Sequence, residues 1–281
     1  MSNICRAIAE EIEEKTGIPS FSVKTNGIHT YSHGLSKAWS AISSRFTRER
    51  EKTKEPSLNI LGASPMDIGR KEIYADLCAW IGAQNFTINA SCALESDLSC
   101  IERLSSAHKS LVIAQSGLAL AKELWNHYGI PYVVGFPQGE FGKELSWSLH
   151  ESREPVFPAK RRSSPDSSIL LLGESVAMTS LAKALEMRFD QSCRVISPLE
   201  ESEDILSEND LQWKEDEGEL RKCFKNAKII VADPLYKAIA PQDALFIPYG
   251  HIAYSGRIAF DEIPNLISKS VDTFLPEEAL C

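Results

Sequence analysis

A polar loop between two apolar segments is the first place where this sequence could do chemistry. The stretch "VKTNGIHTYSHGLSKAWSAI", residues 23–42, is rich in groups that donate and accept hydrogen bonds, and its glycines allow close backbone approach to a bound group. A loop whose polar groups satisfy one another, or cap the following helix, would explain the same pattern. The candidate ligand-binding residues of this loop are Asn26, Gly27, His29, Tyr31, Ser32 and His33.

Three further loops follow predicted strands and should share one rim with the first, because ligands of parallel sheets bind outside the carboxyl ends of the strands. They are "GASPMD" at 62–67, "VIAQSG" at 112–117 and "GHIAYSGRIAF" at 250–260. Arg257 would offer a planar guanidinium to an anionic group, or would pair locally with Asp261 or Glu262. In the corresponding turn "GES", Glu174 is predicted to cap a helix. These loops add Ser64, Gln115, Ser116, His251, Tyr254, Ser255 and Arg257 to the candidates.

The loops need a scaffold, and the chain repeatedly places a short β-branched run before a turn and an amphipathic stretch. This order is typical of βα units, and nearly continuous apolar runs indicate strands that are buried on both faces. The predicted fold class is α/β, with two Rossmann-like parallel-sheet lobes that carry helices on both faces. The predicted strands are "PSFSV", "LNILGA", "FTINA", "SLVIAQ", "PYVVGF", "SILLLG", "CRVIS", "AKIIVAD" and "ALFIPYG".

The division of the chain follows from its composition. The stretch "HESREPVFPAKRRSSPDSS", dense in Pro, Ser and charge, indicates a linker between the two lobes. The sequence predicts a helix that places Ile4, Ile8 and Ile12 on one face and ends at Gly17. This helix precedes the first predicted strand, and no strand is predicted before it. The sequence therefore predicts an N-terminal remnant of a third lobe at 1–53, and Rossmann-like domains at 54–152 and 166–281.

Charge and cysteine usage exclude several classes of protein. A net charge of -9 and a pI near 5.3 over 281 residues argue against a nucleic-acid or anionic-membrane surface. Without a long apolar run or a signal-peptide pattern, a cytoplasmic location is expected. The seven cysteines include no CxxC pair, so reduced, mostly buried thiols are expected and no residue is assigned to a metal.

The order of several segments resembles that of nitrogenase component 1 proteins, a family that includes cofactor-assembly scaffolds and dark-operative protochlorophyllide reductase subunits. "EEKTGIPSFSVKTNGIHTYSHGLSKAWSAI" is similar to the end of the family's first domain, and the stretch from "LNILGASPMDIGRKEIYADLCAW" to "PYVVGFPQGE" is similar to its second. "SILLLGESVAMTSLAKALE", "AKIIVADPLYKAIAP" and "IPYGHIAYSGRIAFDEI" resemble its third domain. The resemblance covers nearly the whole chain.

The resemblance implies a redox setting in which electrons reach a metallocluster or a tetrapyrrole between lobes. The family's cluster cysteines lie upstream of the part that this sequence matches, and Cys5 falls after that ligand region. The cofactor-bearing subunit of the family also uses a Cys and a His, and here Gln115 or Ser116 and Ile258 or Ala259 stand near those positions. None of these four is a soft-metal ligand, so binding of the family's cofactor by these two ligands is not expected.

The expected function is that of a nitrogenase component 1-like oxidoreductase subunit, working anaerobically, that binds a metallocluster or tetrapyrrole-type ligand in an interlobe cleft. An iron–sulfur or other metallocluster would be supplied with a partner subunit, in a homo- or hetero-oligomer, and an ATP-dependent iron protein is a further candidate partner. A non-redox carrier or sensor of small molecules is the alternative. A transferase with two nucleotide-binding-like lobes is a third hypothesis, against which the lack of a Gly-rich phosphate fingerprint counts.

Overall fold

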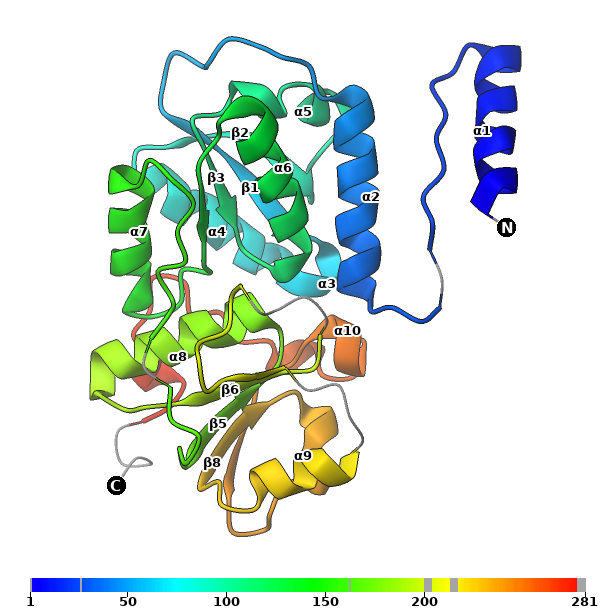
Figure 1. Ribbon diagram of the computed structural model, residues 1–281. Coiled ribbons are helices and arrows are strands. Elements are labelled where there is room, and N and C mark those ends of the chain that lie inside the picture. The colour runs from blue at the N-terminus through cyan, green and yellow to red at the C-terminus, as the bar shows by residue number, and fades with distance from the viewer. Residues whose placement is uncertain (1, 26, 162, 200–203, 213–216, 277–281) are drawn as a thin grey trace.

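The computed structural model describes residues 2–25, 27–161, 163–199, 204–212 and 217–276. Within these ranges the chain forms two parallel sheets, one in each lobe (Figure 1), which confirms the predicted α/β class. The first sheet has the order β2-β1-β3-β4 and comprises β1 (Ser57–Ala63), β2 (Thr87–Ala93), β3 (Lys109–Val112) and β4 (Tyr132–Val134). The second has the order β7-β6-β5-β8-β9 and comprises β5 (Ile169–Leu172), β6 (Arg194–Ser197), β7 (Leu211–Gln212), β8 (Ile229–Ala232) and β9 (Leu245–Pro248).

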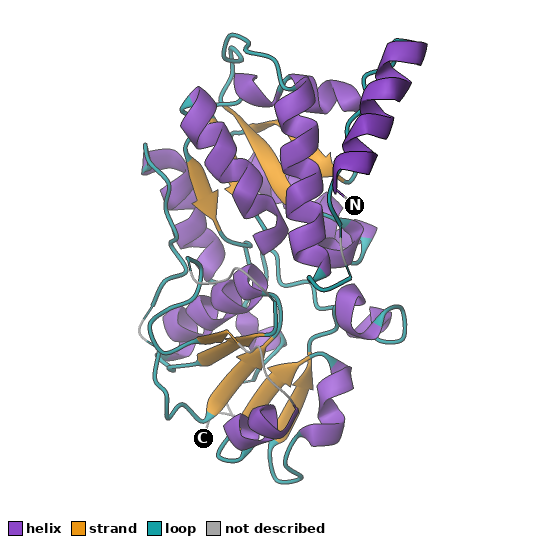
Figure 2. Cartoon of the chain, turned by 45° about the vertical axis from the view of Figure 1, so that its right-hand side comes forward, coloured by secondary structure: helices purple, strands orange, loops and turns teal. Residues whose placement is uncertain are grey.

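Helices lie on both sides of the strands (Figure 2), as parallel pairing requires, because each crossover connection must run over a face of the sheet. The α-helices are α1 (Ser2–Thr16), α2 (Tyr31–Phe46), α3 (Pro65–Ile68), α4 (Lys71–Ala83), α5 (Leu98–Glu102), α6 (Leu118–Tyr128), α7 (Phe141–Glu151), α8 (Ser175–Phe189), α9 (Glu217–Phe224) and α10 (Ile252–Ser255). Short 3-10 turns are η1 (Leu104–Ser106), η2 (Gln115–Gly117), η3 (Pro234–Ile239), η4 (Phe260–Glu262) and η5 (Val271–Thr273).

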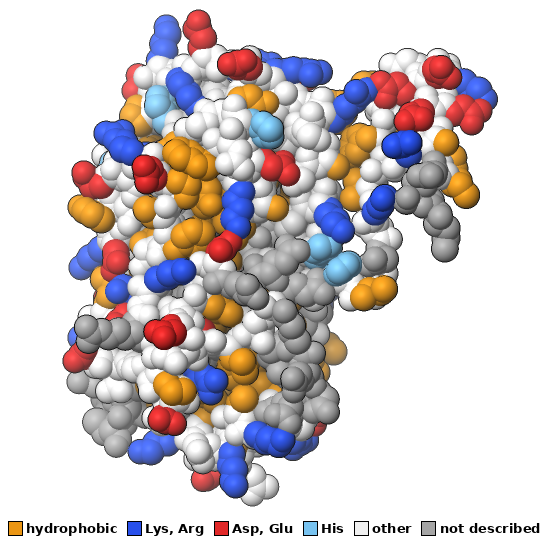
Figure 3. All heavy atoms as spheres, in the orientation of Figure 1, with side chains coloured by type: hydrophobic (Ala, Val, Ile, Leu, Met, Phe, Trp, Pro, Cys, Tyr) orange, Lys and Arg blue, Asp and Glu red, His pale blue; other side chains and the backbone are white. Residues whose placement is uncertain are grey.

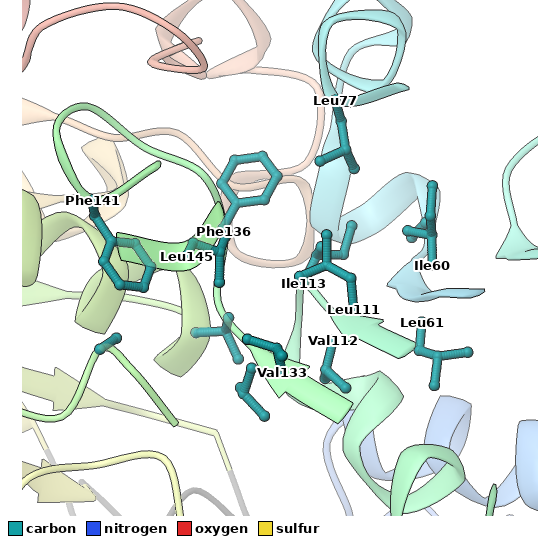
Figure 4. Packing of buried hydrophobic residues seen from close by; sticks show 14 of the residues in the cluster. Ile60, Leu61, Leu77, Leu111, Val112, Ile113, Val133, Phe136, Phe141 and Leu145 are labelled. Atoms are coloured by element: carbon teal, nitrogen blue, oxygen red, sulfur yellow. The ribbon is translucent and has the colours of Figure 1, made fainter. Parts of the chain in front are cut away.

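The hydrophobic core runs through both lobes. All seven residues of β1 are buried, which fits its nearly continuous apolar sequence. Around it, Leu77 of α4 and Ile113 after β3 approach Phe136 and the neighbouring strands (Figure 4). The same buried cluster extends from Leu58 to Leu275, so the two lobes share one core. A smaller cluster, which includes Phe224 of α9, lies in the second lobe.

The predicted strand "PSFSV" is wrong. Residues 17–30 that the structure describes form an extended connection outside either sheet, and this connection carries α1 away from the first lobe (Figure 1). We call α1 and this connection the N-terminal arm. A β-strand needs a neighbouring strand to pair its backbone groups, and the arm lies beside none. The short strand β7, by contrast, was not among the predicted strands.

The isoleucine stripe of α1 faces solvent. Ile4, Ile8 and Ile12 are 62%, 51% and 46% exposed, and hydrophobic side chains are visible on the surface of the arm (Figure 3). The arm contacts α2 through an ion pair between Arg45 and Glu13. The predicted helix and its end at Gly17, which has a φ of 69°, are confirmed. The helical spacing of the isoleucines therefore predicts the helix but not whether the apolar face of that helix is buried by the rest of the chain.

The linker between the lobes is tightly packed. Val156 exchanges backbone hydrogen bonds with Tyr132 and Val134, at 3.0 Å each, and so extends the edge of the first sheet. Arg161 donates from both guanidinium nitrogens to Asp210, and the two side chains are 1% and 0% exposed. Arg161 of the predicted linker is therefore buried by its pairing with Asp210, and Arg162 lies outside the described residues.

The segment after β9 returns to the first lobe. Gly139 donates its backbone N–H to the carbonyl of Leu266 at 3.0 Å, and Ser270 donates to Glu140 at 2.7 Å. Val271 is fully buried and lies against Gly139. Residues 263–275, which we call the C-terminal segment, are thus a second connection between the lobes beside the linker.

Candidate functional site

Both sheets direct the carboxyl ends of their strands toward the space between the lobes, which we call the junction. Each sheet also reverses its strand order once, between β1 and β3 and between β5 and β8. Such reversals open the crevices where α/β sheets bind ligands. Asp67 follows β1 and Ser116 follows β3, whereas Glu174 follows β5 and Asp233 follows β8. The polar residues at the two reversals therefore meet across one interface.

Asp67 is the centre of the polar contacts from the first lobe. Its carboxylate accepts hydrogen bonds from Tyr31 at 2.7 Å, Ser64 at 2.5 Å and Ser116 at 3.1 Å, and its side chain is 4% exposed. Ser64 also caps α3 by accepting from the Asp67 N–H at 3.2 Å. Burial raises the pKa of Asp67, and the three hydroxyl donors oppose that rise by stabilising the carboxylate.

Tyr31 connects the polar loop of the N-terminal arm to Asp67. It is the first residue of α2, so its phenol reaches from the arm side of the molecule into the junction. Burial, with the neighbouring charge of Asp67, raises the pKa of Tyr31 well above its ordinary value. Tyr31 therefore stays a protonated hydrogen-bond donor at physiological pH.

Glu174 enters the junction from the second lobe. Its two carboxylate oxygens accept from the backbone N–H groups of Gln115 and Ala177, at 2.8 Å each, so it caps α8 and also ties this lobe to the turn after β3. The prediction of Glu174 as a helix cap is confirmed. Burial and then the nearby charge of Asp67 raise the pKa of Glu174 to about 7, despite the hydrogen bonds from the backbone.

His251 lies opposite Asp67 and is held in one tautomer. Its Nδ1 accepts the N–H of Ala253 at 3.2 Å, which assigns the proton of the neutral ring to Nε2. Nε2 lies 3.8 Å from Oδ1 of Asp67 and has no hydrogen-bond partner among the described residues. That distance would allow an ion pair, but it is too long for a hydrogen bond. Burial lowers the pKa of His251 to about 4, so the neutral ring is favoured.

Asp233 fixes the loop that carries His251. Its carboxylate accepts from the backbone N–H of His251 and from the hydroxyl of Ser255, at 2.8 Å each, and it also caps η3. The Tyr254 ring lies 4.9 Å from the His251 ring, and burial raises the pKa of Tyr254 well above its ordinary value. The loop after β9 is therefore held rigidly at the end of β8.

The structure brings together seven of the thirteen candidate residues around the junction, and it places the other described ones elsewhere. Arg257 is exposed and forms no ion pair with Asp261 or Glu262 in the part of the chain that the structure describes, so the local pairing is wrong. Asn26 lies outside the described residues. Gly27 and His29 are exposed, His33 stacks on His29 with ring centroids 4.1 Å apart, and Ser32 bonds locally to Thr30. The residues at the junction are Tyr31, Ser64, Gln115, Ser116, His251, Tyr254 and Ser255.

Sequence reasoning missed the acidic residues at the centre of this site. Asp67 stands three residues after Ser64 at a predicted helix start, which is a capping pattern. Asp233 stands directly before the Pro that begins η3. Those local signals indicate caps and say nothing of contacts across the junction. Tyr249, which donates to Gln138 at 3.0 Å, had no signal of its own.

A small cavity lies inside the junction. Its volume of about 30 Å³ has room for one or two water molecules, since one water needs roughly 10–15 Å³. Apolar side chains, including Ile113, Phe136 and Ile263, form most of its wall. Its polar lining comes from Asp67, Glu174, Tyr249 and His251.

Among the residues that the structure describes, no group of three or more His, Cys, Asp or Glu side chains could hold a metal ion, although Asp67, Glu174 and His251 line one cavity. Cys5 is exposed on α1, whereas Cys92, Cys100 and Cys193 are buried at separate places in the sequence. Burial raises the pKa of the Cys92 and Cys193 thiols to about 12, and metals bind the thiolate. Among the helices described, none is both long and apolar enough to cross a membrane.

Comparison with known proteins identifies relatives of this architecture. The family profile described as nitrogenase component 1 type oxidoreductase matches residues 2–147, about half of the chain. The solved structure "Nitrogenase Cp1 at pH 6.5" aligns with 96% of this chain and 73% of its own, at a TM-score of 0.56 and 12% identity. "Nitrogenase Cp1 at pH 5" aligns with 98% of this chain and 68% of its own, at a TM-score of 0.57 and 14% identity. A search of curated proteins found no match.

Proposed function

We propose, on the premise that this chain belongs to the nitrogenase component 1-type oxidoreductase family, that it is a cluster-free subunit of a redox assembly. In this proposal the chain binds a reducible ligand and provides acid–base groups beside it. A partner subunit carries the metallocluster, and a further partner, such as an ATP-dependent iron protein, delivers electrons. The observation that carries the proposal is the meeting of protonatable groups, without converging soft-metal ligands, at the carboxyl ends of both sheets.

The described residues of this chain do not fit a resident iron–sulfur cluster. Such a cluster usually needs four converging thiolates, and among the described residues no group of His, Cys, Asp or Glu could hold a metal ion. Gln115 and Ile258 stand near the positions where the family's cofactor-bearing subunit has its ligands. The backbone N–H of Gln115 donates to the Glu174 carboxylate, and Ile258 is exposed. A cluster that works with this chain would therefore be held by the partner.

The size of the junction cavity supports a ligand site that is shared with the partner. Pockets for drug-sized ligands occupy about 300–1,000 Å³, whereas the cavity inside the junction measures about 30 Å³. A metallocluster or tetrapyrrole would need either an opened junction or a place on its outer rim. His29 and Arg257 are exposed outside the junction, and Arg257 could pair with the carboxylates that many tetrapyrroles carry.

Anaerobic copurification tests this proposal. The chain would be produced alone and together with a candidate component 1-type partner subunit, and iron and the visible absorption spectrum would be measured in each preparation. The expected result is a stable complex that contains iron, and an isolated chain that contains none. Reconstitution of the isolated chain to about four irons, lost on Cys5→Ser, would contradict the proposal.

A second candidate function, a non-redox carrier or sensor, is favoured by the lack of a metal-holding group among the described residues. It predicts that the isolated chain binds a small ligand with an affinity that does not change when the ligand is reduced or oxidised. The matched comparison is Arg257→Lys, which keeps the charge but loses the planar fork. Weaker ligand binding by this variant, with no iron-containing partner, would favour the carrier or sensor.

A further inference from the structure

The junction contains two carboxyl groups that belong to different lobes and line one cavity. Asp67 comes from α3 in the first lobe, and Glu174 comes from the turn before α8 in the second. In this part of the fold α3 faces α10 across the junction (Figure 1), so the loop with His251 lies against the same cavity. Two buried carboxyl groups that line one small cavity disfavour simultaneous ionisation, because like charges in a poorly hydrated site repel strongly.

His251 adds a polar atom that has no hydrogen-bond partner in the part of the chain that the structure describes. The residue is 7% exposed, its Nε2 lacks a hydrogen-bond partner among the described residues, and its Nδ1 contact leaves the proton on Nε2. A buried donor without an acceptor is costly. The cavity that His251 lines has room for a water molecule, which could accept a hydrogen bond from this N–H and donate hydrogen bonds to the carboxyl groups.

We propose that Asp67 and Glu174 form a proton-sharing site across the junction, bridged by one water molecule that is anchored by the Nε2–H of His251. The transfer conserves charge: the Glu174 carboxyl gives its proton to the water, and the water gives one of its own protons to the Asp67 carboxylate. Glu174 becomes ionised, Asp67 becomes neutral, and the water is regenerated. No electron acceptor or donor takes part.

The other titratable groups that face this site support a single mobile proton. Tyr31 and Tyr254 are neutral donors, since burial raises the pKa of both. Tyr249 donates a hydrogen bond to Gln138, and Asp233 accepts hydrogen bonds from the backbone N–H of His251 and from Ser255. The two carboxyl groups are thus left to exchange the proton, at a pH near the value at which Glu174 titrates. A group that titrates near neutral pH suits acid–base catalysis.

This inference goes beyond the proposed function, because it concerns the isolated chain and needs no partner, cluster or ligand.

The first test uses the unsubstituted protein. Nitrogen-15 NMR of its histidines should show one ring, identified by its loss in His251→Gln, that stays neutral with its proton on Nε2 at pH 5.5. A water cross-peak to that proton is expected. Titration of His251 near its ordinary value, or absence of the cross-peak, would overturn the proposal.

Infrared spectroscopy tests the sharing of the proton. A protonated-carboxyl band should titrate near neutral pH and should vanish in Glu174→Gln. In Asp67→Asn the midpoint of this band should fall by about one pH unit, because the repelling charge is gone. An unchanged midpoint would show that the two acids are independent and would sink the proposal.

A pair of alanine-to-valine variants tests the bridging water without changing either carboxyl group. Ala177 lines the cavity, so Ala177→Val should displace the water while keeping every titratable group. The cross-peak to the His251 ring should disappear in this variant and persist in Ala83→Val, a change at an exposed alanine at the end of α4. Persistence of the cross-peak in Ala177→Val would place the water elsewhere and contradict the proposal.

Discussion

Glu174 makes opposing contributions to the stability of the fold. Its backbone hydrogen bonds cap α8 and tie the lobes together, yet the charge of its carboxylate is buried. Because the folded pKa of about 7 lies above the ordinary value of 4.5, the folded state holds a proton that the unfolded state loses between these two values. Stability therefore falls as pH rises from 4.5 to 7 and changes no further from this cause above pH 7.

Glu174→Gln should remove this contribution to the pH dependence of stability, since glutamine has the shape of the protonated acid and does not ionise. Relative to the wild type, the variant should gain stability by up to about 1.4 kcal/mol for each pH unit between 4.5 and 7. Urea unfolding at several pH values measures it. His251 acts in the opposite direction below pH 6.5 in both proteins, so it cancels in the difference. A difference that stays constant with pH would contradict the raised pKa.

At this scale the sequence could predict helix caps but not contacts between elements that are distant in the chain. Ser64 and Asp67 are three residues apart at a helix start, and their mutual hydrogen bonds follow from that spacing. The bond from Tyr31 to Asp67 joins residues 36 positions apart. No local pattern encodes such a pair, which arises only because the ends of two elements meet. For that reason the rim loops were predicted while the acid at their centre was missed.

Among the elements, β1 and η2 approach so closely that only a glycine fits between them. A Cβ on Gly117 would lie 2.5 Å from the carbonyl carbon of Leu61 and 2.6 Å from the nitrogen of Gly62. These are backbone atoms of a fully buried strand, which cannot move aside without disturbing the sheet. The close approach sets the position of Ser116 beside Asp67.

Gly117→Ala should therefore destabilise the protein by about 1–3 kcal/mol or more, as overpacking does. Gly82→Ala is the matched control, because nothing lies within 4 Å of the added methyl group and the site is helical. That control should be neutral or stabilising by about 0.4–1 kcal/mol. Thermal unfolding of both variants decides the matter, and equal melting temperatures would refute the packing argument.

A protease should cut the N-terminal arm before it cuts the linker between the lobes. Composition alone would direct cleavage to the Pro- and Ser-rich linker, but there Arg161 is buried and Val156 is paired with a strand. Lys24 is exposed in a segment without sheet hydrogen bonds. Cleavage requires local opening, which costs least where few contacts are lost.

Brief trypsin treatment, read by mass spectrometry, should show cleavage after Lys24 before cleavage after Lys160 or Arg161. Asp210→Asn supplies a control, because weakening the ion pair of Arg161 should make the linker more susceptible and leave the arm unchanged. If the linker were cut first in the wild type, the packing described for it would be wrong.

For the whole molecule, the shared core predicts one cooperative unfolding transition. Two lobes joined by a loose linker would unfold separately, whereas here one buried cluster includes residues of both sheets and of the C-terminal segment. Calorimetry should give equal calorimetric and van't Hoff enthalpies. Val271→Ala, which removes two buried methyl groups at the contact with Gly139, should lower that single melting temperature. Two resolved transitions would show that the lobes are independent.

The C-terminal segment also has a consequence for how the protein is made. A ribosome releases the chain from its N-terminus, and early domains usually fold while later ones are still being synthesised. Here the hydrogen bonds of Gly139 and Glu140 in the first lobe cannot form until Leu266 and Ser270 have been synthesised. These two residues follow the whole second sheet in the chain. Until then the nascent first lobe exposes apolar surface that Val271 and Leu275 will bury. The final packing of the first lobe therefore follows the synthesis of the second sheet, and chaperones would have access to this face until then.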